Sequence, residues 1–377
     1  MRRTMNKQTP NPGENKHILL ITYAVVGMFV CLMGYFGYFL QVQSETVINN
    51  SYNARLDSFS DRIIRGKILS NDGRVLAETA VQEDGSEVRI YPYQDLFAHA
   101  VGYSDHGKAG LEALANFYLL SSHMNLEEQT LNQLADRKNL GDNVITTLDV
   151  DLQQAAQAAL GDRKGAVVAL EPDTGKILAM VSRPGFDPNT LGQEWETLIS
   201  GDNTQAQLLN RVSQGVYPPG STFKIVTALE YIREHPNTWQ EFSFDCDGSY
   251  EHGDYTISCY HGNAHGHQNL PQAFANSCNG AFASLGLELN LEQMQNLAER
   301  LLFNGQLPVS IAYSKSSYAM GTGASDWERL QTAIGQGNTQ MTPLHNALLT
   351  ASIANGGVLM KPYLIDRVET SEGEEVK

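Results

Sequence analysis

The chain opens with one long apolar segment and continues as short apolar runs separated by polar turns. Ile18–Leu40 contains no charged side chain. At a rise of about 1.5 Å per residue, a helix of this length crosses a hydrocarbon core of roughly 30 Å. A signal peptide is the alternative, but its apolar region is usually about 7–15 residues, and no A-x-A cleavage site follows Leu40. The pattern therefore predicts a transmembrane anchor at 18–40.

The charges beside this segment predict its orientation. A single acid, Glu14, lies among the basic residues that precede it. Those basic residues are Arg2, Arg3, Lys7 and Lys16. Because basic flanks stay on the cytoplasmic side, we expect residues 1–17 to be a cytoplasmic tail and everything after the anchor to lie outside the membrane.

Residues 41–143 are expected to form a connector and a small domain. The connector, up to residue 60, is polar. Gly66–Ser70 and Arg74–Ala77 flank an Asn-Asp-Gly turn, which predicts a β-hairpin. Apolar residues at helical spacing recur within 109–138.

Residues 144–377 are expected to form a second, larger domain. A strand is predicted at 144–148 and a helix at 151–160. Two apolar runs, 165–170 and 176–182, flank an Asp-Thr-Gly turn and predict an antiparallel hairpin. Most of the remaining chain has helical patterns interrupted by Gly and Pro. A hairpin followed by many helices indicates an α+β domain with an antiparallel sheet and a helical subdomain.

The composition argues against two classes of protein, those that bind nucleic acid and those built on many disulfides. The chain has 377 residues, 26 Lys and Arg against 42 Asp and Glu, and a formal net charge of −16. Nucleic-acid binding draws its affinity mainly from basic side chains, so no nucleic-acid partner is expected. Four cysteines are too few for a disulfide-dense scaffold.

The first candidate for chemistry is the Ser221–Lys224 pair. A Pro-Pro-Gly sequence precedes Ser221, and apolar residues at helical spacing follow it. Residues three apart share one face of a helical turn, so the lysine can take the serine proton if its pKa is lowered toward neutrality. Ser221 as a plain helix N-cap is the alternative.

The second candidate is Ser277-Cys278-Asn279. A hydroxyl and an amide in one short loop could relay a proton and bind a substrate amide. A cap between two helices is the alternative.

Together these motifs resemble the class B penicillin-binding proteins, which are membrane-anchored peptidoglycan transpeptidases. The resemblance extends over about residues 60–377 and includes motifs of an N-terminal pedestal and of the transpeptidase domain. The matching motifs are Arg65-Gly66-x-Ile68, Asp72-Gly73-x-x-Leu76-Ala77, Gly110-Leu111-Glu112, Thr146-Thr147-Leu148-Asp149, Glu171-Pro172-x-Thr174-Gly175, Tyr217–Lys224, Gly335-Gln336-Gly337 and Ala354-Asn355-Gly356-Gly357.

The resemblance implies a fold like that of serine β-lactamases and a role for each motif residue. Ser221 would be acylated by a D-Ala-D-Ala stem peptide, with Lys224 as its general base. Ser277 and Asn279 would relay protons and bind the peptide. β-Lactams would acylate the same serine, and no cofactor or catalytic metal is expected. Beyond stem peptides, β-lactams and the bacterial cytoplasmic membrane, a multi-span glycan polymerase is the expected partner.

One motif of the resemblance is absent. The family carries K-T-G, K-S-G or H-T-G on a strand beyond Ala354–Gly357, and no such tripeptide occurs in this chain. We expect the sequence to be truncated before that motif. The hairpin at 165–182 would then lack sheet neighbours and the domain would be marginally stable, which puts its activity in question.

Cysteines and histidines crowd one stretch ahead of the second motif. They are Cys246, His252, Cys259, His261, His265 and His267. A disulfide between Cys246 and Cys259, free buried thiols and a zinc site are all open, although no C-x-x-C spacing occurs. Cys278 is not expected to be the nucleophile, because Ser221 has the base beside it.

The sequence also leaves alternatives of function open. A D,D-carboxypeptidase uses water as the acceptor, and a degenerate relative would be a non-catalytic scaffold. A β-lactam receptor is disfavoured because the expected cytoplasmic tail is too short for an output domain. Roles in cell shape and in cell division are not distinguished.

Overall fold

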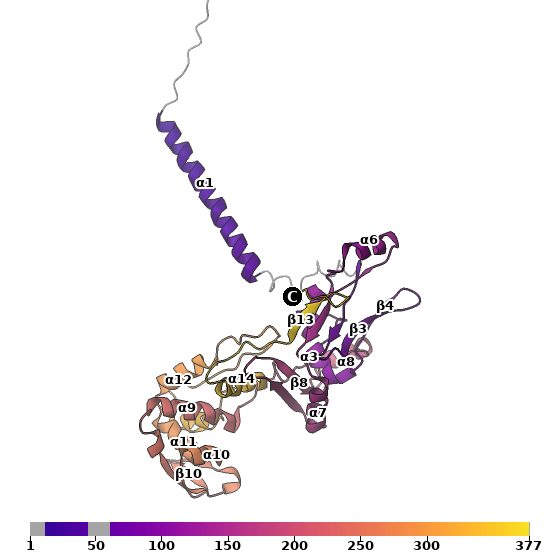
Figure 1. Cartoon of the computed structure of the whole chain (residues 1–377). Coiled ribbons are helices and arrows are strands. Elements are labelled where there is room, and N and C mark those ends of the chain that lie inside the picture. The colour runs from indigo at the N-terminus through magenta and orange to yellow at the C-terminus, as the bar shows by residue number, and fades with distance from the viewer. Residues whose placement is uncertain (1–11, 44–60, 377) are drawn as a thin grey trace, which may run out of the picture.

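The computed structural model describes residues 12–43 and 61–376 (Figure 1). Helix α1 (Pro12–Tyr38) continues into a short π-helix, η1 (Phe39–Gln43). The segment Lys16–Val42 is long and apolar enough to cross a membrane, and none of its most apolar window is buried against the rest of the protein. This agrees with the predicted anchor. Most of the predicted tail and connector lies outside the described residues.

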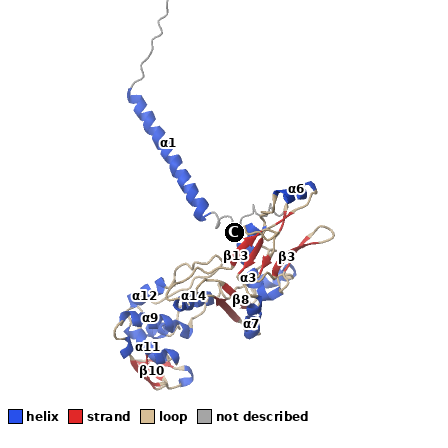
Figure 2. Cartoon of the chain, in the orientation of Figure 1, coloured by secondary structure: helices blue, strands red, loops and turns tan. Residues whose placement is uncertain are grey.

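A five-stranded sheet joins the small domain to the far end of the chain. Its order is β13-β6-β2-β3-β4, with β6 and β2 parallel and the other neighbours antiparallel. The strands are β2 (Ile68–Leu69), β3 (Val75–Val81), β4 (Glu87–Ile90), β6 (Asn143–Thr146) and β13 (Ile365–Glu369). The predicted hairpin is β2 with β3. Because β13 pairs with β6, the sheet continues across the expected domain boundary after residue 143 (Figure 2).

The helical stretch expected at 109–138 is three helices. These are α4 (Gly110–Leu114), α5 (Asn116–Leu119) and α6 (Leu126–Leu134). The break has a local cause: the Asn125 side chain accepts a hydrogen bond from the Glu128 backbone and starts α6 afresh. After α6, β5 (Asn139–Leu140) runs parallel to β1 (Ile63–Ile64).

A buried carboxylate holds the small domain together. Glu112 of α4 is fully buried, and its two oxygens lie 2.6 Å from Arg65 Nε and 2.7 Å from Arg89 Nε. Arg65 also donates to the Asn116 side chain, 2.6 Å away. Burial alone would raise the pKa of Glu112, but the two guanidinium groups outweigh it and hold that pKa below its usual value. Two motifs far apart in sequence thus meet in one ion cluster.

A buried glutamine connects the small domain to the predicted second hairpin. That hairpin is β7 (Gly165–Leu170) and β8 (Ile177–Arg183), which pair antiparallel as expected. Gln153 lies on α7 (Val150–Leu160), and its amide nitrogen donates to Leu96 O and Met180 O, each 2.8 Å away. Among the described residues, β7 and β8 form a sheet of two strands, with Ile177 also bonded to Tyr363.

Most of the regular elements in the remaining chain are helices, as predicted, with loops between them. The helices are α3 (Ala98–Val101), which belongs to the small domain, and α8 (Leu191–Ile199), α9 (Lys224–Glu234), α10 (Leu270–Ala275), α11 (Asn279–Glu288), α12 (Leu291–Arg300), α13 (Asp326–Ala333) and α14 (Pro343–Ala354). An apolar core around Phe223, Phe282 and Phe303 lies among these helices. The fold is mixed α+β, in agreement with the sequence.

Two strand pairs at residues 243–269 were not predicted. They are β9 (Ser243–Cys246) with β12 (Gly266–Asn269), and β10 (Ser249–His252) with β11 (Tyr255–Ser258). Each strand has only four residues. Polar and apolar side chains alternate in β9 (Ser-Phe-Asp-Cys) and β11 (Tyr-Thr-Ile-Ser), but only over the shortest length that predicts a strand, and β12 has no apolar side chain. Figure 1 shows this region beside α10 and α11.

We predict that Glu112→Gln lowers the free energy of unfolding by about 3–5 kcal/mol, because it leaves two buried guanidinium groups short of a charge partner. Glu78→Gln is the matched control. It breaks the more exposed Lys67–Glu78 pair, 3.0 Å long, and is expected to change the same quantity by less than about 1 kcal/mol. Denaturant unfolding measures both.

The same cluster predicts an acid sensitivity. A carboxyl whose pKa is lower in the folded state stabilises the fold above its unfolded pKa, and that contribution is lost as pH falls through the folded value. Glu112→Gln should therefore flatten the acid limb of the stability curve. An unchanged acid limb would contradict the role given to Glu112.

Candidate active site

Ser221 lies in a single turn of 3₁₀-helix, η4 (Gly220–Phe223), that leads directly into α9. Its side chain is exposed and caps neither helix. The N-cap alternative is therefore wrong. Phe223, two residues on, is buried and packs edge-to-face on Phe303 with ring centres 5.7 Å apart. The apolar stripe of α9 thus fixes the turn and leaves the Ser221 hydroxyl at the surface.

The backbone before Ser221 is held by a second segment of chain. Tyr217 and Met341 exchange two backbone hydrogen bonds, of 3.0 and 2.8 Å, and Gly220 N donates to Gly335 O at 2.8 Å. Gly335 has a φ of +73°, and a Cβ there would lie only 1.9 Å from Gly220 O. Glycine is thus required at 335 for this close approach. The Gly-Gln-Gly motif serves to position the turn that carries Ser221.

Lys224 opens α9 and is almost completely buried, with 1% of its surface exposed. Burial in this setting lowers the pKa of its amine to about 8, while the Cys278 and Cys259 thiols act in the opposite direction. An amine with such a pKa is neutral in a useful fraction of molecules near neutral pH. That is the requirement for a lysine to act as a base.

Four oxygen atoms surround the Lys224 amine. The nitrogen lies 2.6 Å from Ser277 O, 2.7 Å from Asn279 Oδ1, 3.0 Å from Ser277 Oγ and 3.3 Å from Ser221 Oγ. The first two oxygens can only accept hydrogen bonds, so they take two N–H groups. A neutral amine then has only its lone pair left, and this faces the two hydroxyl groups. The structure therefore brings all four predicted site residues together, with Lys224 at the centre.

Ser277 reaches Lys224 because of how α10 ends. Ser277 N donates to Phe274 O and Cys278 N to Ala273 O, the two bonds of a Schellman motif. Ser277 occupies the left-handed position of that motif, with a φ of +51° where glycine is usual. Non-glycine residues in this region carry a strain of about 1–3 kcal/mol and often mark functional sites. Serine at this position, unlike glycine, supplies a hydroxyl that contacts the Lys224 amine.

Asn279 is oriented by a partner on the other side. Its amide nitrogen donates to Ser258 O at 2.9 Å, at the end of β11. Turning the amide over would set its NH₂ group against the Lys224 amine and its oxygen against Ser258 O. The network therefore fixes the oxygen toward Lys224. Cys278, between the two motif residues, is the N-cap of α11. The helix-cap alternative is therefore correct for Cys278, while the side chains of Ser277 and Asn279 on either side contact Lys224.

The crowded cysteines and histidines separate into distinct contacts. Cys246, Cys259 and Cys278 are buried and unbonded, so the disulfide alternative does not describe this structure. His252 lies 3.1 Å from Asp326, and His267 lies 2.9 Å from Asp245. Only His265 joins the cysteines.

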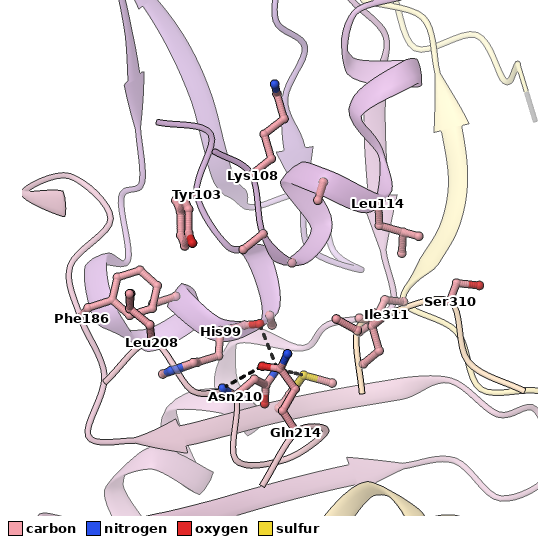
Figure 3. A pocket seen from close by; sticks show the side chains of 18 residues that line it. His99, Tyr103, Lys108, Leu114, Phe186, Leu208, Asn210, Gln214, Ser310 and Ile311 are labelled. Atoms are coloured by element: carbon pink, nitrogen blue, oxygen red, sulfur yellow. Dashed lines mark hydrogen bonds between the residues drawn. The ribbon is translucent and has the colours of Figure 1, made fainter. Parts of the chain in front are cut away.

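A separate cavity of about 380 Å³ lies beside α3 and α4 (Figure 3). His99 and Asn210 line it, and none of the four site residues does. Burial lowers the pKa of His99 to about 4, and its Nε2 lies 2.7 Å from Gln207 O. Asn210 in turn donates to His99 O, 3.2 Å away. These polar groups already have protein partners.

Two supports of the site were not inferred from sequence. The close approach of Gly335 to Gly220 could not be inferred, because the requirement for glycine at 335 depends on a neighbour that is distant in sequence. The contact of Asn279 with Ser258 depends on β11, whose four residues were not recognised as a strand.

Comparisons with known proteins agree with this geometry. The penicillin binding protein transpeptidase domain matches residues 165–377, and the penicillin binding protein A dimerisation domain matches residues 65–144. The peptidoglycan D,D-transpeptidase PbpA of Mycolicibacterium smegmatis is 33% identical over 338 residues, 83% of this chain and 67% of that protein. The peptidoglycan D,D-transpeptidase MrdA of Acinetobacter baumannii is 30% identical over 319 residues, 74% of this chain and 47% of that protein.

Solved structures give the same result. The ceftriaxone acyl-enzyme complex of penicillin-binding protein A from M. tuberculosis superposes with a TM-score of 0.74 and 31% identity, covering 85% of this chain and 76% of that one. This chain thus spans about two thirds of the mycobacterial relative's length and about half of MrdA.

We predict that Gly335→Ala displaces the turn that carries Ser221. Its Cβ would overlap Gly220 O, so we expect a loss of at least about 1 kcal/mol in unfolding free energy and at least tenfold slower acylation by a penicillin. Gly337→Ala is the matched control: its φ is also positive, +78°, but its nearest neighbours are side-chain atoms of Gln331 at 3.6 Å. Equal acylation rates in the two variants would contradict the positioning role of Gly335.

Proposed function

Since this chain belongs to the class B penicillin-binding proteins, a family of peptidoglycan D,D-transpeptidases, we propose that Ser221 is its acylated nucleophile and Lys224 its general base. The observation that carries the proposal is the contact of the buried Lys224 amine with Ser221 Oγ, 3.3 Å apart. We propose further that the substrate is a stem peptide ending in D-Ala-D-Ala.

The first half-reaction forms an acyl-enzyme. The neutral Lys224 amine takes the Ser221 proton while Oγ attacks the carbonyl carbon of the penultimate D-Ala. The backbone N–H of Ser221 donates to the developing oxyanion. The C–N bond then breaks, and the terminal D-Ala leaves with a proton that returns from Lys224 by way of the Ser277 hydroxyl, 3.0 Å from the amine.

The second half-reaction transfers the acyl group. An amine of a neighbouring stem peptide loses its proton to Lys224 and attacks the ester carbon. The C–O bond to Ser221 then breaks, and Lys224 returns a proton to Ser221 Oγ, 3.3 Å away. Asn279 holds the lysine with its oxygen, and we propose that it also contacts the peptide amide. A β-lactam enters the first half-reaction in the same way, but its leaving nitrogen stays tethered.

Two alternatives are less well supported. A carboxypeptidase would use water in the second half-reaction, but the two relatives described above, PbpA and MrdA, are named transpeptidases. A non-catalytic scaffold would have no need of a buried lysine held among four oxygens.

The apolar helix α1 is consistent with a membrane anchor. We propose that the N-terminus is cytoplasmic and the catalytic domain lies on the outer side, because the basic residues precede the span. A multi-span glycan polymerase, which supplies uncross-linked strands, is the proposed membrane partner.

Benzylpenicillin acylation tests the nucleophile. We expect intact-mass measurement of the full chain in detergent to show one penicilloyl adduct. Ser221→Ala should abolish it. Thr222→Ala is the matched control, because its hydroxyl is adjacent in sequence but donates to Pro219 O. An adduct that persists in Ser221→Ala would contradict the assignment.

The pH profile tests the base. Because only the neutral amine accepts a proton and its pKa is about 8, the acylation rate constant should rise about tenfold per pH unit below that value and level off above it. Stopped-flow acylation between about pH 6 and pH 9 measures this. A rate that is flat over that range would contradict Lys224 as the base.

A further inference from the structure

Four metal-binding side chains converge beneath the second motif. The Sγ atoms of Cys246, Cys259 and Cys278 and a ring nitrogen of His265 all lie within 4.8 Å of one another. They come from the end of β9, the residue after β11, the residue before β12 and the N-cap of α11. Four separate pieces of chain therefore deliver one ligand atom each to the same point.

Three of the six distances between these atoms are close to the edges of a zinc tetrahedron, and the other three are below 4.8 Å. With Zn–S bonds of about 2.3 Å and Zn–N bonds of about 2.0–2.1 Å, tetrahedral angles place two sulfurs about 3.8 Å apart and a sulfur and a nitrogen about 3.5 Å apart. Cys246 Sγ lies 3.7 Å from Cys259 Sγ and 3.3 Å from His265 Nδ1. Cys259 Sγ lies 3.8 Å from Cys278 Sγ.

We propose that Cys246, Cys259, His265 and Cys278 form a closed Cys₃His site for a structural Zn²⁺ ion. All three cysteines are buried, at 3%, 4% and 0% exposure, and His265 is partly buried, so a substrate could reach the ion only from the histidine side. Three sulfurs and one imidazole are a ligand set typical of structural zinc and unlike the oxygen sets of Mg²⁺ or Ca²⁺.

The backbone around the sulfurs is arranged to support thiolates. Ala281 N donates to Cys278 Sγ at 3.4 Å, and the backbone N–H groups of Gly248 and His265 donate to Cys246 Sγ. Gly248 has a φ of +112°, and a Cβ there would lie 2.4 Å from Gly262 O. The turn after Cys246 therefore has to be glycine to bring its N–H onto the sulfur.

The ion would have a positioning role in the proposed function. Cys278 lies between Ser277 and Asn279, the two residues that contact Lys224 Nζ. The ion would tie this loop to β9, β11 and β12, three strands of only four residues each. This consequence rests on the proposed function, whereas metal binding itself does not.

Metal content of the full chain, purified in detergent without chelator, tests the site. We expect about one Zn²⁺ per chain by mass spectrometry of the metal, and the absorption bands of tetrahedral thiolate-bound Co²⁺ after exchange. Cys246→Ser and His265→Ala should lose both signals. His265→Cys, which supplies a fourth thiolate, should retain them, and so should Cys31→Ser in the membrane helix, the matched cysteine control. A metal-free protein with a Cys246–Cys259 disulfide or three titratable buried thiols would overturn the proposal.

Benzylpenicillin acylation of the metal-loaded and chelated protein tests the positioning role. We expect acylation to slow by about tenfold or more on metal removal and to recover on adding Zn²⁺. Equal rates with and without metal would contradict the positioning role. A metal-loaded chain that is never acylated would instead contradict the proposed function and leave the zinc site intact. If the chelated protein unfolds, metal-loaded His265→Cys supplies the comparison. It keeps the ion but lacks the imidazole, and penicillin should acylate it at close to the rate of the unaltered protein.

Discussion

Burial of one amine is the constraint on which the catalytic half of this protein depends. Lys224 is 1% exposed, and its nitrogen has four oxygen neighbours from three different residues. A buried ammonium is unfavourable unless polar groups compensate it, and this arrangement compensates it only partly. The result is an amine with a pKa of about 8, next to a serine hydroxyl. The weak solvation of the lysine and the reactivity assigned to the serine have the same physical origin.

The rest of the fold serves to hold the partners of that amine. The Ser221 turn is anchored to the Gly335 segment, and Ser277 is presented by a helix end that tolerates an unfavourable backbone conformation. Asn279 is fixed by the end of β11. The proposed zinc ion joins the segments that carry Ser277 and Asn279. On the other side, a buried glutamine and the strand β13 connect this domain to a small domain organised by Glu112.

Many of the helices and strands could be predicted from the sequence, because each has a pattern within its own residues. The apolar span, the two hairpins around Gly-containing turns and the helix after Ser221 each carry a strong short-range pattern. The helical spacing at 109–138 was correct, but the segment is divided into three helices, the last of which starts afresh at its Asn125 cap. The strands at 243–269 were missed because each has only four residues, too few for the alternation in β9 and β11 to stand out.

The contacts that complete the site could not be predicted because they join residues distant in sequence. The approach of Gly335 to Gly220 and the meeting of Arg65 with Glu112 were present only as motifs of a resemblance, without a physical reason. The cysteine cluster shows the same limit. Its members were noticed, but spacing alone left a disulfide, free thiols and zinc open, and only the tetrahedral distances favour one of them.

The most direct test of the central claim is a titration of the Lys224 amine itself. Lysine side-chain NMR of the isotopically labelled full chain, with Lys224→Met to assign the resonance, follows its protonation without reference to turnover. The account predicts a midpoint near 8, well below the ordinary lysine value of about 10.4. A midpoint at the ordinary value would show that burial does not neutralise the amine, and the assignment of Lys224 as the base would fail.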